Sequence, residues 1–196
     1  MLFFAYERDW TCVVRAIKKA FSKKDKISNN QRDDIIIKIA GGAGQQSILE
    51  AFEKIKQAEN ASSKIEPPED ANTKNEKNLT VEKLDFMNQE EWDGMMSEMD
   101  FMIVRGEDSM AQSCLIGTPF IWQAYPQKDN YQMVKVKALL ERMRNHFGDE
   151  FKYVENAWIS LNDYSNVEDD TGNSVSWKTD DSKIENNVYD FILHIE

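Results

Sequence analysis

A charged hexapeptide, VRGEDS (Val104 to Ser109), has residue types suited to binding a ligand. It ends an apolar run typical of a strand and opens a run with helical spacing. A helix start presents unpaired backbone N–H groups and the positive end of the helix dipole, which favours phosphate. Arg105 would add a forked positive charge for phosphate oxygens. Glu107 and Asp108 would repel phosphate, so we assign them to sugar hydroxyls or to orienting Arg105. The hexapeptide therefore predicts a ligand with an anionic and a hydroxylated part.

Two other segments could join this site. The sequence GGAG (Gly41 to Gly44) follows a strand-like run and is either a plain tight turn or a ligand loop, since it lacks a full dinucleotide or P-loop motif. Tyr125, Pro126 and Gln127 follow another apolar run. Arg105 could instead form only an ion pair at a helix start. We favour function, because Gly106 suggests a close backbone approach to a ligand.

Alternating patterns indicate the elements that position these residues. Asp9 is a predicted helix cap, and Asn88 with Glu91 fits a capping box. The run Ile35 to Ile39 predicts a strand buried on both faces. Strands alternating with helices predict an α/β fold with a Rossmann-like, three-layer parallel sheet, whose ligands bind beyond the carboxyl ends of the strands. The predicted strands lie at 2–6, 35–39, 79–86, 101–104 and 120–125. The predicted helices lie at 10–21, 45–55, 89–99, 133–147, 151–161 and 184–196, and another runs from VRGEDS to Gly117.

The chain divides into one main domain and a tail. Residues 1–163 are predicted to form one α/β domain, interrupted at 59–78 by a mobile, polar surface loop. Residues 164–183 are predicted to be an acidic flexible segment. Residues 184–196 have helical spacing and predict a C-terminal helix.

The charge, the apolar segments, the cysteines and the histidines argue against several kinds of partner and site. A formal net charge of -11 argues against a nucleic-acid partner, because such proteins normally carry a basic stripe. Neither a signal peptide nor a membrane span is visible, so we expect a cytoplasmic protein. The two cysteines, Cys12 and Cys114, are expected to be reduced and to lie in the core. His146 and His194 lack metal-ligand neighbours, so we expect no metal site.

The stretches DFMIVRGEDS and GTPFIWQAYPQ, which span residues 100–127, resemble the signature region of bacterial protein-arginine rhamnosyltransferases that modify elongation factor P. The resemblance extends more weakly to LDFMNQEEWD and to Phe4-Ala5-Tyr6. It implies that residues 1–163 are a nucleotide-sugar-binding domain, the C-terminal, donor-binding half of a GT-B glycosyltransferase. Such an enzyme transfers rhamnose from dTDP-rhamnose to an arginine of elongation factor P with inversion.

The resemblance also implies roles for individual residues. Glu107 would face the reacting rhamnose or support the transition state, and no cofactor or metal would be needed. The family's general base lies in an N-terminal domain, so this chain is expected to bind the donor and to be inactive alone, whether it is a fragment, a separately encoded half or a remnant. The donor-binding residues would be Phe4, Tyr6, Phe86 and Gln89 around the base and its sugar, and Arg105, Asp108, Ser109 and Tyr125 at the diphosphate, with Gln127 beside them.

Two other functions remain open on the sequence. The chain could be a non-catalytic interaction module that pairs with an N-terminal domain or another subunit. It could also be a GT-B domain for another sugar nucleotide, because a fold alone does not select a substrate.

Overall fold

The computed structural model describes residues 1–27, 35–62, 79–164 and 178–194. Within them, five parallel strands form one sheet in the order β3-β2-β1-β4-β5. The strands are β1 (Leu2–Phe3), β2 (Ile35–Ile39), β3 (Leu79–Lys83), β4 (Met102–Arg105) and β5 (Phe120–Gln123). The α-helices are α1 (Thr11–Ile27), α2 (Gln45–Ser62), α3 (Gln89–Ser97), α4 (Gly106–Ile116), α5 (Gln132–Met143), α6 (Phe151–Asn162) and α7 (Asp181–His194), and the short 3-10 helices are η1 (Lys128–Asn130) and η2 (Arg144–His146).

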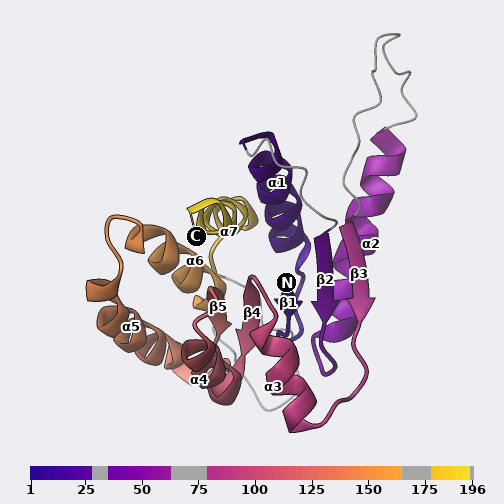
Figure 1. The fold of residues 1–196 in the computed structure, drawn as a ribbon. Helices are drawn as coiled ribbons and strands as arrows, with labels where there is room; N and C mark the ends of the chain where they lie inside the picture. The colour runs from indigo at the N-terminus through magenta and orange to yellow at the C-terminus, as the bar shows by residue number, and fades with distance from the viewer. Residues whose placement is uncertain (28–34, 63–78, 165–177, 195–196) are drawn as a thin grey trace.

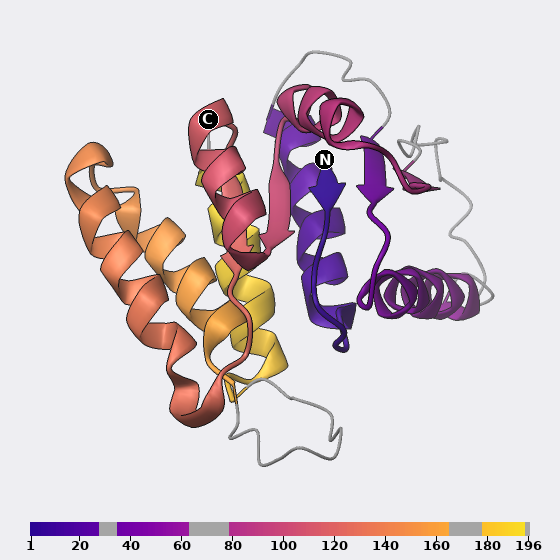
Figure 2. The ribbon, with the colours of Figure 1, turned by 90° about the horizontal axis from the view of Figure 1, so that it is seen from below.

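Helices cover both faces of the sheet, which makes three layers. Helices α1, α2 and α7 lie on one face, and α3 and α4 lie on the other, as Figures 1 and 2 show together. Helix α6 continues the first layer beside α7, and α5 packs outside α6. The α/β class with a three-layer parallel sheet is therefore confirmed.

The strand order reverses direction at β1. The chain first builds outward from β1 to β2 and β3, and then returns to place β4 and β5 on the other side of β1. In register, Phe3 lies between Ile39 of β2 and Ile103 of β4. In open α/β sheets, the crevice beyond such a switch point is where ligands bind. The segments after β1, β2 and β4 meet there.

The helix starts follow the sequence signals. The Asp9 carboxylate accepts a hydrogen bond from the Thr11 backbone N–H (2.9 Å) and caps α1. Asn88 and Glu91 form both halves of the capping box at α3. Both capping predictions are thus confirmed.

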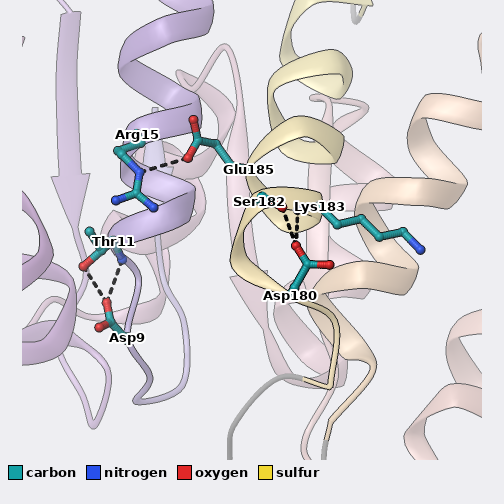
Figure 3. A network of polar contacts seen from close by, with 7 residues as sticks. All are labelled: Asp9, Thr11, Arg15, Asp180, Ser182, Lys183 and Glu185. Atoms are coloured by element: carbon teal, nitrogen blue, oxygen red, sulfur yellow. Dashed lines mark hydrogen bonds and ion pairs between the residues drawn. The ribbon is translucent and has the colours of Figure 1, made fainter.

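A long-range ion pair and a local cap hold α7 in place. Asp180 accepts from the Lys183 N–H and from the Ser182 hydroxyl at the start of α7. Arg15 of α1 pairs with Glu185 of α7 at 2.9 Å (Figure 3). The apolar side of α7, including Ile184 and Val188, is fully buried. The C-terminal helix therefore packs as part of the same body as α1.

Three burial predictions were wrong. The Ile35 to Ile39 strand is buried on one face only, since successive side chains alternate and Ile36 is 43% exposed. Helical spacing in the sequence predicts that Phe147 faces inward, but Phe147 is exposed, because the backbone becomes extended there after η2 and leaves the helical face. Cys114 is exposed, whereas Cys12 is buried, because α4 turns Ser109 and Ser113 toward the protein instead.

The segment boundaries differ in detail from those expected. Helix α2 continues to Ser62, into the segment expected to be a loop, and the remainder of that segment lies outside the described residues. In the acidic segment, Tyr164 is buried, and residues 165–177 lie outside the described part of the chain. Helix α7 begins at Asp181, slightly earlier than expected, and Ile195 is not among the described residues.

Candidate functional site

A cavity of about 290 Å³ opens at the switch point of the sheet. Its walls come from the segment after β1 and from the junction of β4 with α4. The lining residues are Phe4, Tyr6, Arg105, Gly106, Glu107, Asp108 and Ser109. The structure therefore brings the VRGEDS motif together with two aromatic residues that lie about a hundred positions away in the sequence.

Arg105 is held between the two aromatic rings. Its Cζ lies 4.6 Å from the centre of the Phe4 ring and 4.8 Å from the centre of the Tyr6 ring. Cation–π contacts of this kind fix the guanidinium without neutralising it. Among the described residues, no carboxylate forms an ion pair with Arg105. Its charge thus remains for a ligand that enters the cavity.

The start of α4 supplies backbone donors beside this charge. The helix begins at Gly106, whose φ of 73° is a left-handed value that glycine adopts readily. The Gly106 carbonyl accepts a hydrogen bond from the Trp122 indole N–H (2.8 Å), which ties the turn to β5. The N-cap residue of α4, Arg105, makes no capping hydrogen bond with its side chain. The free N–H groups of α4 and the positive helix end therefore face the same cavity as Arg105.

Glu107 is engaged by a lysine from another helix. Its Oε1 lies 3.0 Å from the Nζ of Lys135 on α5, and both side chains are about half exposed. The neighbouring Asp108 is exposed, whereas Ser109 is 8% exposed, and both line the cavity. Lys135 offsets one of the two acidic charges at the rim, which lowers their repulsion of an anion.

Tyr125 contacts Tyr6, which lines the cavity. The two rings meet edge to face with 5.5 Å between their centres, and Tyr125 is 59% exposed. The Tyr6 backbone N–H donates to the Gln123 Oε1 (2.7 Å), which fixes the segment after β1 against β5. Burial raises the pKa of the Tyr6 hydroxyl above its ordinary value, so this group stays a neutral donor.

Gln127 lies in the loop after β5, which hydrogen bonds hold in place. Its backbone N–H donates to the Gln132 Oε1 (2.9 Å). Asn162, which is fully buried, accepts from the Ala124 N–H and donates to the Trp122 carbonyl, each at 2.7 Å. These bonds hold the loop after β5 in place, but Gln127 itself does not line the cavity.

Phe86 and Gln89 are not among the residues that line the cavity. The Phe86 side chain is fully exposed, and the Gln89 side chain donates to Asp93 on its own helix (2.6 Å). Trp92, one turn further along α3, contacts Phe4 at 5.2 Å between ring centres instead.

Several residues of the site were missed on the sequence. Gly42 contacts it from the turn after β2, Trp122 from β5 and Lys135 from α5, and nothing in the local sequence gives Trp122 or Lys135 a role at the site. For the turn at Gly41 to Gly44, the sequence left two interpretations open, a plain tight turn or a ligand loop. Only its position beside β1 in the sheet shows that it abuts Arg105.

Within the described ranges, no helix is both long and apolar enough to cross a bilayer. The same residues contain no group of three or more histidine, cysteine or acidic side chains that could hold a metal ion.

Comparison with known families gives an independent result. The family model for "Elongation-Factor P (EF-P) rhamnosyltransferase EarP" matches residues 4–189. The chain belongs to this family. The resemblance seen in residues 100–127 is therefore confirmed over nearly the whole chain.

Individual relatives match shorter stretches. The protein-arginine rhamnosyltransferase of Shewanella oneidensis is 32% identical over 84 residues, which are 43% of this chain and 20% of that protein. Its counterpart from Pseudomonas putida is 36% identical over 72 residues, or 37% of this chain and 19% of that protein. The matched stretches thus span about a fifth of these relatives' lengths.

A solved structure shows the same fold. A chain from the structural study of EarP-mediated arginine glycosylation of translation elongation factor EF-P superposes with a TM-score of 0.58 and 16% sequence identity. The match covers 98% of this chain and 50% of that chain. This chain therefore has the fold of half of that glycosyltransferase, as the resemblance implied.

Proposed function

We propose that this chain is the dTDP-rhamnose-binding part of an inverting glycosyltransferase that rhamnosylates an arginine of elongation factor P. The observation that carries the proposal is Arg105, whose charge lies between two aromatic rings at the start of α4 and faces a cavity. A cation beside free helix N–H groups suits a diphosphate. Family membership points to the sugar nucleotide and to the acceptor.

In this proposal the site acts on the leaving group. When the acceptor nitrogen attacks the anomeric carbon of rhamnose, its proton passes to the general base that the resemblance assigns to an N-terminal domain. The bond to the diphosphate oxygen breaks, and negative charge grows on dTDP. Arg105 and the N–H groups of α4 stabilise that charge, which lowers the barrier. Glu107 faces the sugar, and Lys135 keeps its carboxylate in place. The positive groups come from the protein, so we propose that no metal ion is required.

Calorimetric titration tests the proposal. We expect this chain to bind dTDP more tightly than UDP or GDP, with no change when EDTA is added. Equal binding of the three nucleotides would favour a different sugar nucleotide, and no binding of any of them would contradict a donor site.

The variant Arg105→Ala tests the residue that carries the argument. It should weaken dTDP binding by about 1.5 to 3 kcal/mol, because a charge-assisted phosphate contact is lost. Its free energy of unfolding should fall by no more than about 1 kcal/mol, the scale of a partly exposed cation–π contact. An unchanged affinity would remove Arg105 from the site.

A further inference from the structure

The turn that follows β2 packs directly against the guanidinium of Arg105. A β-carbon on Gly42 would lie 2.7 Å from the Arg105 Nη2 and 3.5 Å from its Cζ. The next nearest atom would be Cε2 of Phe4, at 3.9 Å. Gly42 also has a φ of 120°, which residues with a side chain rarely adopt. A side chain at position 42 would therefore strain the backbone and displace the Arg105 guanidinium from the space it occupies.

The guanidinium is thus confined on three sides. Phe4 and Tyr6 contribute rings, and Gly42 contributes a bare backbone. Arg105 also lines the cavity. None of these three neighbours carries a charge, so the arrangement fixes the position of the cation and leaves its charge for a ligand.

We propose that Gly42 is a positioning residue for diphosphate binding, acting through Arg105. By leaving room beside the two rings, it sets the place from which the guanidinium reaches the phosphate oxygens. The inference rests on the proposed function, because it assigns to the same site a residue from a different strand and turn. A larger residue at position 42 would push Arg105 out of its slot.

The other glycines of the turn provide contrasts. A β-carbon on Gly41 would meet no atom within 4 Å, and its φ lies outside the left-handed range. A β-carbon on Gly44 would collide with the Ala5 backbone carbonyl, so Gly44 is a glycine that packing of the turn requires. Gly41→Ala is therefore the matched control, and Gly44 shows what a purely structural glycine looks like.

A double-mutant cycle distinguishes a role in positioning Arg105 from a purely structural role of Gly42. Gly42→Ala, Arg105→Ala and the double variant would be titrated with dTDP and with inorganic pyrophosphate, and their unfolding followed in urea. We expect Gly42→Ala to lower the affinity for both probes by about 10-fold or more, approaching the loss for Arg105→Ala. In the Arg105→Ala background, Gly42→Ala should change the affinity by less than about 2-fold, since coupled residues are not additive. Gly41→Ala should bind as the unmodified chain does.

The outcomes that overturn the inference are distinct from those that overturn the proposed function. Equal losses from Gly42→Ala in both backgrounds, or no loss in either, would show that Gly42 does not act through Arg105. A chain that unfolds with Gly42→Ala in both backgrounds would make Gly42 a backbone glycine like Gly44. If the unmodified chain binds pyrophosphate without preferring dTDP, the proposed donor fails while the role of Gly42 is still measured by the cycle.

Discussion

Arg8 and Arg105 both stack on tyrosine rings near the carboxyl edge of the sheet, but their surroundings differ. The Arg8 Cζ lies 3.8 Å from the centre of the Tyr164 ring, and Arg8 is 7% exposed. Arg105 stacks at 4.6 and 4.8 Å on two rings and lines a cavity. Burial lowers the pKa of the Arg8 guanidinium below its ordinary value, which records the energetic cost of its position.

The difference shows how one type of contact serves two purposes. Stacking of Arg8 holds two parts of the protein together, because it joins the segment after β1 to Tyr164. The Tyr164 hydroxyl in turn donates to the carbonyl of Ala124, which follows β5 (3.3 Å). Around Arg105 the stacking leaves one side of the cation open. Stability should therefore depend on the first arginine and ligand affinity on the second.

The largest expected effect on stability is that of Arg8→Met. Loss of a desolvated cation–π contact should lower the free energy of unfolding by about 2 kcal/mol, while the affinity of the folded protein for dTDP stays nearly unchanged. Urea denaturation and calorimetric titration measure the two quantities. A stable variant that no longer binds dTDP would place Arg8 in the ligand site and remove the contrast.

Tyr164→Phe is expected to lower the free energy of unfolding by a smaller amount that depends on pH. Loss of its buried hydroxyl, which donates to the Ala124 carbonyl and also hydrogen-bonds with Arg8 and Gln123, should cost about 1.5 kcal/mol at neutral pH. Burial raises the pKa of Tyr164 from 10.0 to about 12, so the unfolded chain ionises this group first. Its contribution to stability is complete below pH 10 and is lost as the pH rises toward 12. The stability gap between the unmodified chain and Tyr164→Phe, measured in urea, should therefore shrink across that range; a constant gap would contradict it.

The smallest effect is expected at the rim, for Lys135→Met. An exposed ion pair contributes little, so the unfolding free energy should change by less than about 0.5 kcal/mol. Freed of its lysine, Glu107 should repel the diphosphate and weaken dTDP binding by a few-fold, with the difference fading at high salt. Lys137→Met, on an exposed position of the same helix, is the control. Equal effects of the two variants would show a general charge effect rather than a role for the pair.

Local signals in the sequence predicted most of the fold. The capping groups at Asp9 and Asn88 are correct, because capping depends on residues within one helical turn. The VRGEDS junction was also placed correctly at the end of β4, since an apolar run followed by a helical period fixes it locally.

The contacts between segments could not be predicted in the same way. That Gly42 abuts Arg105 depends on the strand order, which places β1 between β2 and β4, and an alternating pattern does not specify this order. The pairing of Glu107 with Lys135 depends on how α5 packs. The wrong burial prediction for Cys114 has a different, local cause. The apolar residues of α4 are spread around the helix, so its sequence does not show which side faces inward.

The exposed Cys114 also gives the protein a natural attachment point for an optical reporter. The chain has two cysteines, and burial raises the pKa of the Cys12 thiol to about 12, which suppresses its reactivity. A maleimide fluorophore should thus couple to Cys114, preferably at slightly alkaline pH because partial burial raises the pKa of this thiol too. Eight residues of helix, roughly 12 Å, would separate the dye from Gly106. Changes at the start of α4 could then be followed by fluorescence without introducing a new cysteine.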